Sequence, residues 1–164
     1  MRRFPRIAAL AACINPLAAA HAAGVPLELA LDAARAAISA CKANGYNVTV
    51  TILDPDLSTR VVLRGDGAPG GTVQIAYRKA YTVIKTGMSS ADFGKTVPAP
   101  PALPSGAPPG PPGPVNGDPN LITWAGGLPI KSGGTLLGSM SVSGAPGGDK
   151  DEACVKAGLA TIEK

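Results

Sequence analysis

A proline-rich segment divides this chain of 164 residues into two parts. Ten of the 22 residues from 98 to 119 are proline (PAPPALPSGAPPGPPGPVNGDP). Proline lacks a backbone N–H and its ring blocks the helix interior, so neither a helix nor an inner strand can form here. We expect an extended, exposed, polyproline-II-like segment. Because neither flank carries a complete core by itself, we interpret 98–119 as a loop insertion within one domain.

The composition still allows the rest of the chain to fold. The 21 glycines and 17 prolines together make up about 23% of the residues, close to the level that indicates disorder. However, 45% of the residues are hydrophobic and only 16% are charged, so the chain can bury an apolar core. Disorder is therefore expected to be local.

The first 22 residues have the three parts of a secretory signal peptide. Arginines at positions 2, 3 and 6 come first, an apolar stretch covers residues 7–20, and Ala20-His21-Ala22 provides an A-x-A cleavage site. The stretch is too short and too rich in alanine to span a membrane. We expect a periplasmic or secreted mature domain of residues 23–164. The alternative is a lipoprotein, with Leu10-Ala11-Ala12-Cys13 as the lipobox.

Removal of this segment changes the charge and the available chemistry. Without its three arginines the chain keeps 12 of its 15 Lys and Arg residues against 11 Asp and Glu, so the net charge falls from +4 to +1. No basic patch then argues for nucleic acid. His21 is the one histidine of the chain. The mature protein therefore cannot use Ser-His-Asp or Cys-His catalysis, nor a His-ligated metal.

Two of the three cysteines, Cys41 and Cys154, belong to the mature chain. An even number of cysteines in an oxidising compartment favours a disulfide, which would join the first and last predicted helices. The alternative is a pair of buried thiols that pack as small apolar groups.

The hydrophobic periodicity outlines a series of helices and strands. Apolar residues recur at helical spacing after Pro26 and again from Val73 to about Lys85, whereas β-branched residues alternate in VTVTILD from Val48. The pattern predicts an α+β single domain, with helices packed on an antiparallel sheet of about five strands. The predicted strands are 48–54, 59–64, 121–124, 128–131 and 135–142, and a final helix begins near residue 149.

Three stretches resemble the GlcG/HbpS family of haem-binding-type domains. They are RGDGA from Arg64, RKAYT from Arg78, and GGLPI from Gly126, which is followed by GSMSVSGAPGGDKDEAC from Gly138. The resemblance implies a small α/β sandwich that assembles into homo-oligomers. It also implies haem binding in several members and, in one extracellular branch, a partnership with a sensor kinase.

A haem site would need an iron ligand other than histidine in this chain. Tyr, Met and Cys remain as axial candidates. Tyr77 and Tyr81 stand four residues apart and so share a helix face, and Arg78 and Lys79 beside them could contact haem propionates. Alternatively, the rings pack under the loop and the basic groups are solvated.

A second hypothesis is a small anionic ligand, such as a short organic acid. The glycine-rich loop GDGAPGG, which includes Asp66 and Gly67, leads into the start of the second helix. Backbone N–H groups at such a position can bind an anion, and Arg64 could hold a carboxylate in a bidentate pair. Further along, Asp149, Asp151 and Glu152 are interpreted as favourable charges at the start of the last helix.

These observations favour an exported small-ligand-binding protein, with haem or an anionic metabolite as the ligand and a homo-oligomer as the assembly. Two alternatives stay open. One is an accessory or interaction module for a periplasmic enzyme or sensor. The other is an enzyme acting on haem or a small organic acid, with Lys79 or Tyr81 as the proton-transfer group, which would require a large pKa shift.

Overall fold

Two hairpins from opposite ends of the chain form one sheet in the computed structural model, which describes residues 24–98 and 113–162. The first hairpin is β1 (Thr49–Leu53) and β2 (Thr59–Arg64), and the second is β3 (Gly127–Ser132) and β4 (Thr135–Ser143). All neighbours are antiparallel and the strand order is β2-β1-β4-β3. The two central strands, β1 and β4, therefore join the two parts of the chain.

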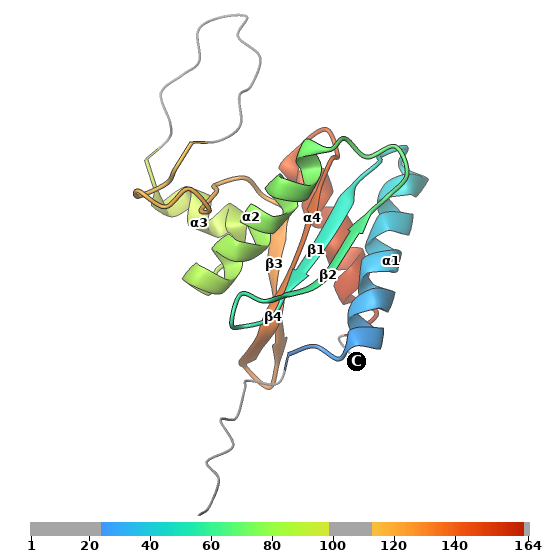
Figure 1. Cartoon of the computed structure of the whole chain (residues 1–164), viewed down its shortest axis with the longest axis horizontal. Coiled ribbons are helices and arrows are strands. Elements are labelled where there is room, and N and C mark those ends of the chain that lie inside the picture. The colour runs from blue at the N-terminus through green and yellow to red at the C-terminus, as the bar shows by residue number, and fades with distance from the viewer. Residues whose placement is uncertain (1–23, 99–112, 163–164) are drawn as a thin grey trace, which may run out of the picture.

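Helices cover both faces of this sheet. Helices α1 (Leu27–Ala43) and α4 (Gly148–Leu159) pack side by side on one face, and α2 (Gly71–Thr86) lies across the other. A short helix, α3 (Ser90–Thr96), packs beside α2 (Figure 1). This three-layer arrangement explains why every residue of β1 is buried. The expected α+β domain, with helices on an antiparallel sheet, is confirmed.

The two faces of the sheet differ in chemistry. Val50 and Ile52 of β1 and Met140 and Val142 of β4 belong to the apolar core shared with α1 and α4. The alternate residues, which point the opposite way in a strand, carry hydroxyl groups. They are Thr49, Thr51, Ser139, Ser141 and Ser143, all of them buried.

Three of these hydroxyl groups, those of Thr49, Ser139 and Ser141, bind α2 to the sheet. Ser139 Oγ donates to the Ala80 carbonyl at 2.9 Å and Ser141 Oγ donates to the Ala76 carbonyl at 2.6 Å. At the start of the helix, the Thr49 and Thr72 hydroxyls lie 2.8 Å apart. The position of α2 is therefore set by hydrogen bonds as well as by apolar contact, which gives its buried side chains a defined place.

The helices end where their sequences provide a stop. Gly87 adopts the left-handed conformation (φ 71°) and its N–H bonds to the Val83 carbonyl at 2.8 Å, which terminates α2. Ser89 then caps α3 by accepting the Asp92 N–H at 3.0 Å.

A disulfide joins the first and last helices. Cys41 of α1 and Cys154 of α4 form this bond, with a Cα–Cα distance of 5.5 Å.

The sheet has four strands instead of the predicted five. Residues 121–124, which we expected to form a strand, are irregular. Ile122 is fully buried as predicted for a strand, but its N–H bonds to Thr82 Oγ1 at 2.9 Å. A side chain of α2 thus satisfies the backbone group that a neighbouring strand would otherwise have bonded.

Several predictions fall on parts of the chain that the structure leaves undescribed. The expected signal peptide (1–22) and most of the proline-rich segment lie outside the described residues. Within residues 24–98 and 113–162, no helix has the length and apolar character needed to cross a membrane.

Candidate functional site

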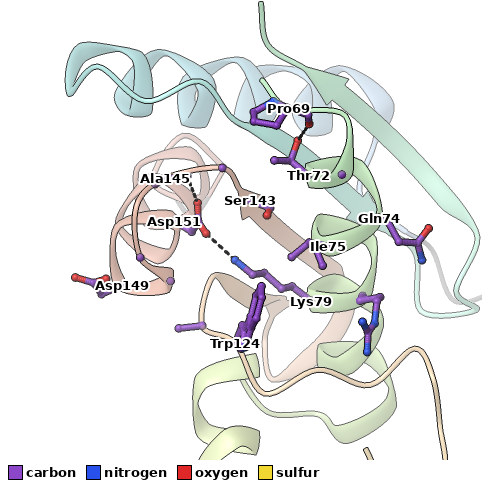
Figure 2. A pocket seen from close by; sticks show the side chains of 16 residues that line it. Pro69, Thr72, Gln74, Ile75, Lys79, Trp124, Ser143, Ala145, Asp149 and Asp151 are labelled. Atoms are coloured by element: carbon purple, nitrogen blue, oxygen red, sulfur yellow. Dashed lines mark hydrogen bonds and ion pairs between the residues drawn. The ribbon is translucent and has the colours of Figure 1, made fainter. Parts of the chain in front are cut away.

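A cavity of about 820 Å³ opens between the first half of α2 and the start of α4. The turn after β4 and the segment before β3 complete its wall. Figure 2 shows side chains from these four places converging on one space. The lining residues include Thr72, Ile75, Lys79, Trp124, Ser143 and Asp151.

A buried ion pair forms the polar base of this cavity. Lys79 Nζ lies 2.6 Å from Asp151 Oδ2 and donates to the Val142 carbonyl at 2.9 Å. The other carboxylate oxygen, Oδ1, accepts the Ala145 N–H at 2.9 Å. Both side chains are at most 5% exposed, so charges that normally stay in water are here held by each other and by the backbone.

The local sequence explains how these two groups meet. Thr72, Ile75 and Lys79 follow at spacings of three and four, so they share one face of α2. Asp151 stands in the first turn of α4, where the helix dipole favours a carboxylate. The helix that begins with Gly148 and the strand that ends with Ser143 therefore bring the carboxylate to the lysine.

Burial shifts the pKa of both groups toward the neutral pair. It lowers the pKa of the Lys79 ammonium, while the charge of Asp151 and the hydrogen bond to it act in the opposite direction. It also raises the pKa of the Asp151 carboxyl, against the opposing effect of Lys79. Desolvation is the leading cause in both cases, so a proton can pass between the two at a smaller cost than between exposed groups.

Arg78 reaches the same cavity but has a structural partner. Its Nη2 donates to the Leu121 carbonyl at 2.8 Å and to the Gly113 carbonyl at 3.1 Å. These bonds fasten the end of the proline-rich segment and the residues just after it onto α2. Burial lowers the pKa of Arg78, against the charge of Asp118. Of the predicted site residues, only Arg78 and Lys79 line the cavity.

The predicted tyrosine pair lies outside the cavity lining. The rings of Tyr77 and Tyr81 are 6.1 Å apart between centroids, as their spacing on one helix face predicts. The Tyr81 hydroxyl donates to Asp118 Oδ2 at 3.0 Å. Burial, this hydrogen bond, the charge of Asp118 and that of Tyr77 raise the pKa of Tyr81.

The predicted anion loop is also separate from the cavity. Arg64 Nε donates to the Ala68 carbonyl at 2.8 Å, so its guanidinium closes the loop on itself. Asp66 and Gly67 are exposed. Arg64 and Asp66 line a smaller hollow of about 270 Å³ between α1 and the end of β2. The structure thus distributes the seven predicted residues over three places.

Sequence reasoning missed the ion-pair partner of Lys79. Asp151 was interpreted as a favourable charge at a helix start, which is true of its position but leaves out its burial. Trp124 was assigned to a strand without a role in a site, and Ser143 was given no role. The GSMSVSGAPGGDKDEAC stretch, which carried the family resemblance, contains Ser143 and Asp151. It was the one signal that could have indicated them.

The donor set of the cavity does not fit an iron-ligating haem site. Haem iron in proteins takes His, Cys, Met or Tyr as its axial ligand. The residues that line the cavity include none of these four types. Among the described residues there is also no cluster of His, Cys, Asp and Glu that could hold a metal ion.

The fold and the site define a class: a small α+β domain with a ligand-sized cavity over a buried ion pair. The family described as "Haem degrading protein HbpS-like" matches residues 25–160. The chain therefore belongs to this HbpS-like family, as the resemblance in its sequence predicts.

Solved structures agree with this assignment. The crystal structure of HbpS is 30% identical, with a TM-score of 0.73, and the match covers 96% of this chain and 100% of that one. A double mutant of HbpS from Streptomyces reticuli is 27% identical, with a TM-score of 0.70, and the match covers 99% of this chain and 100% of that one.

A third structure shares the fold at lower sequence identity. The structure of a PduOC:Heme complex is 21% identical, with a TM-score of 0.70, and the match covers 85% of this chain and 96% of that one. At this identity the likeness shows the fold alone. A search of curated proteins found no match.

Proposed function

We propose that this chain is an exported binding protein that holds a small organic ligand in the cavity above Lys79 and Asp151. The observation that carries the proposal is the cavity itself. Its volume of about 820 Å³ lies within the range of small-molecule sites, and the Lys79 and Asp151 pair lies in its lining.

The walls of the cavity suit an organic ligand with one polar end. Ile75, Pro69 and the side chain of Trp124 provide apolar surface, and Trp124 remains 40% exposed. A ligand that covered Trp124 would remove apolar surface from water, which stabilises the complex. Beside Trp124, the Lys79 and Asp151 pair can hydrogen-bond a carboxylate, hydroxyl or carbonyl oxygen (Figure 2).

A ligand screen with matched variants tests this proposal. Ile75→Ala removes apolar surface from the cavity, whereas Val73→Ala removes it from the same helix outside the cavity. We expect calorimetry with a panel of small carboxylic acids, aldehydes and ketones to find a ligand. Ile75→Ala should weaken its binding by roughly fivefold to tenfold, the equivalent of about 1 kcal/mol of lost contact. Equal effects of both substitutions would contradict binding in the cavity.

Haem is the second candidate ligand, because the family description names it. The cavity lining supplies no ordinary iron ligand, so the phenol oxygens of Tyr77 and Tyr81 are the groups on α2 that could take this place. Arg78 and Lys79, the predicted propionate partners, already bind Leu121 and Asp151. Titration with haemin should give a saturable Soret shift that Tyr77→Phe or Tyr81→Phe weakens. A shift equal to that on an unrelated protein would exclude haem.

Export belongs to the same proposal and rests on residues 1–22. We expect the mature protein to begin at Ala23, which N-terminal sequencing of the protein from the periplasm or medium would establish. A lipid-modified N-terminus at Cys13 would indicate the lipoprotein alternative instead. Retention of the full N-terminus would contradict export through this segment.

Self-association is supported by apolar side chains on the surface. Leu27 and Leu29 of α1 are 49% and 44% exposed, and Val62 of the neighbouring edge strand β2 is 42% exposed. Burial of these residues between copies would favour a homo-oligomer. Sedimentation equilibrium of the wild type and a Leu29→Glu variant tests this, because the charged variant should be the smaller species.

A further inference from the structure

Lys79 is buried from the outer surface of the protein but lines the cavity. Its side chain is 2% exposed, yet it is one of the residues that line the cavity. Figure 2 shows it extending from α2 across the space toward Asp151, with Trp124 alongside. A small molecule that fills the cavity is therefore brought against Nζ.

The backbone of Gly126 packs closely against this amine. A Cβ added to Gly126 would lie 2.9 Å from Lys79 Nζ and 2.7 Å from the Asp151 Cβ, and Gly126 has a φ of 112° that other residues rarely adopt. Any other residue at position 126 would press on the pair. The backbone thus approaches the amine without a side chain, as it does at sites where a close approach is required.

A role in stability alone does not account for this arrangement. A buried ion pair is a weak source of stability, because a well-packed apolar pair of similar volume often does as well or better. Lys79 and Asp151 also line the cavity that α2, α4 and the turn after β4 leave between them. A lysine that is desolvated in a pocket is the usual environment of an amine that reacts with carbonyl groups.

We propose that Lys79 binds a small aldehyde or ketone covalently, as a reversible Schiff base formed at the base of the cavity. This inference rests on the proposed function, since it names the substrate class of the same site. The lowered pKa of Lys79 supports it, because a larger fraction of the amine is then neutral.

The two side chains can carry out every proton transfer of this reaction. The Lys79 ammonium first gives a proton to the Asp151 carboxylate, 2.6 Å away. The freed lone pair then attacks the carbonyl carbon, a C–N bond forms, and the C=O electron pair moves to oxygen. That oxygen takes one proton from the attacking nitrogen and one from Asp151, and it leaves as water while the nitrogen lone pair forms the C=N bond. The products are a protonated imine, an ionised Asp151 and one water molecule, without any oxidant or reductant.

The cavity selects the size and character of the carbonyl compound. The apolar side chains of Ile75 and Trp124 suit a short carbon skeleton. The carbonyl oxygen would point to the Lys79 and Asp151 end. Exposed lysines such as Lys85, further along α2, lack a cavity and a buried carboxylate. These exposed lysines therefore serve as an internal control for the reactivity of Lys79.

Reductive trapping tests the proposal on the intact wild-type chain. The protein is incubated with propionaldehyde or with pyruvate at neutral pH in the presence of cyanoborohydride, and modified lysines are mapped by peptide mass spectrometry. We expect a saturable adduct at Lys79 that forms at least about tenfold faster than the adduct at Lys85, because the cavity holds the carbonyl compound against the Lys79 side chain. Lys79→Arg keeps a cation beside Asp151 and should abolish this fast adduct, whereas Lys85→Arg should leave it unchanged.

The outcomes separate this inference from the proposed function. Adducts at exposed lysines with Lys79 unmodified would overturn the covalent step. If calorimetry then still showed an Ile75-dependent ligand, the cavity would remain a binding site without covalent chemistry. If neither an adduct nor a ligand were found, both proposals would fail. Because the peptide map uses the wild-type protein, a folding defect in Lys79→Arg would not obscure the result.

Discussion

At the scale of single residues, the burial of the Lys79 and Asp151 pair determines how strongly a substitution at either position destabilises the fold. The pair is buried and each partner has one further hydrogen bond, to the Val142 carbonyl and from the Ala145 N–H respectively. Removal of either side chain leaves the other as an isolated charge in a low dielectric environment. Such a charge costs several kcal/mol unless its protonation changes.

The substitution Lys79→Met should therefore lower the free energy of unfolding by about 3–5 kcal/mol. The double variant Lys79→Met with Asp151→Leu should be less destabilised than the single one, because no buried charge remains. Urea unfolding at neutral pH measures both. Lys95→Met provides the control, since Lys95 pairs with Asp92 at 2.7 Å on the exposed surface and should matter little. A double variant that is as unstable as Lys79→Met or less stable would contradict this account.

The Tyr81 hydroxyl provides a prediction for alkaline pH. Burial and the bond to Asp118 raise the pKa of Tyr81 above its ordinary value, which is about 10. Since the folded-state pKa exceeds that of the unfolded chain, the stabilising contribution is complete below about pH 10. It is lost as the pH rises through the folded-state value.

Ultraviolet titration of tyrosinate measures this effect. The absorbance that disappears in Tyr81→Phe identifies the transition of Tyr81 in the wild type. Asp118→Asn should move that transition to lower pH, because it removes a negative charge next to the forming phenolate. An unchanged transition in Asp118→Asn would show that the contact at 3.0 Å has no electrostatic consequence.

At the scale of helices and strands, the periodicity of the sequence predicted the elements but not all of their contacts. Helix α2 was expected to bury a stripe of small apolar residues such as Ala76, Ala80 and Val83, and it does. It also buries Lys79, which no helical pattern of apolar residues can indicate. The partner carboxylate is 72 positions away in the chain, so the burial depends on tertiary structure.

The contact between α1 and α4 requires a glycine. A Cβ on Gly158 would lie 2.6 Å from the Ala33 carbonyl oxygen and 2.6 Å from Met140 Cε. Gly158→Ala should force the helices apart and lower the free energy of unfolding by about 1–3 kcal/mol. Gly71→Ala is the matched control, because nothing lies within 4 Å of its added Cβ. Its effect should be less than about 1 kcal/mol, and a stabilising sign is expected. Equal losses in denaturation experiments would refute the close packing.

At the scale of the whole molecule, the sequence predicted the α+β class and family correctly and overcounted the strands. The alternation that predicted β1 reflects a sheet with an apolar face and a hydroxyl face. Residues 121–124 were also predicted to form a strand, yet Thr82 of α2 takes up the Ile122 N–H. The cavity was not predicted either, because its wall comes from four segments that are distant in the sequence.

The Cys41–Cys154 disulfide joins the first helix to the last across 113 residues. A cross-link over a loop of this length limits the unfolded chain strongly, so its removal should cost about 2–5 kcal/mol. We expect the urea midpoint of the wild type to fall on addition of a reductant. The double variant Cys41→Ala with Cys154→Ala should have a midpoint near that of the reduced protein and should not respond to the reductant. Both helices also pack through Gly158 and Leu159, so the reduced protein should still unfold cooperatively. A wild-type midpoint that is the same with and without reductant would show that the bond adds nothing to the stability of the folded chain.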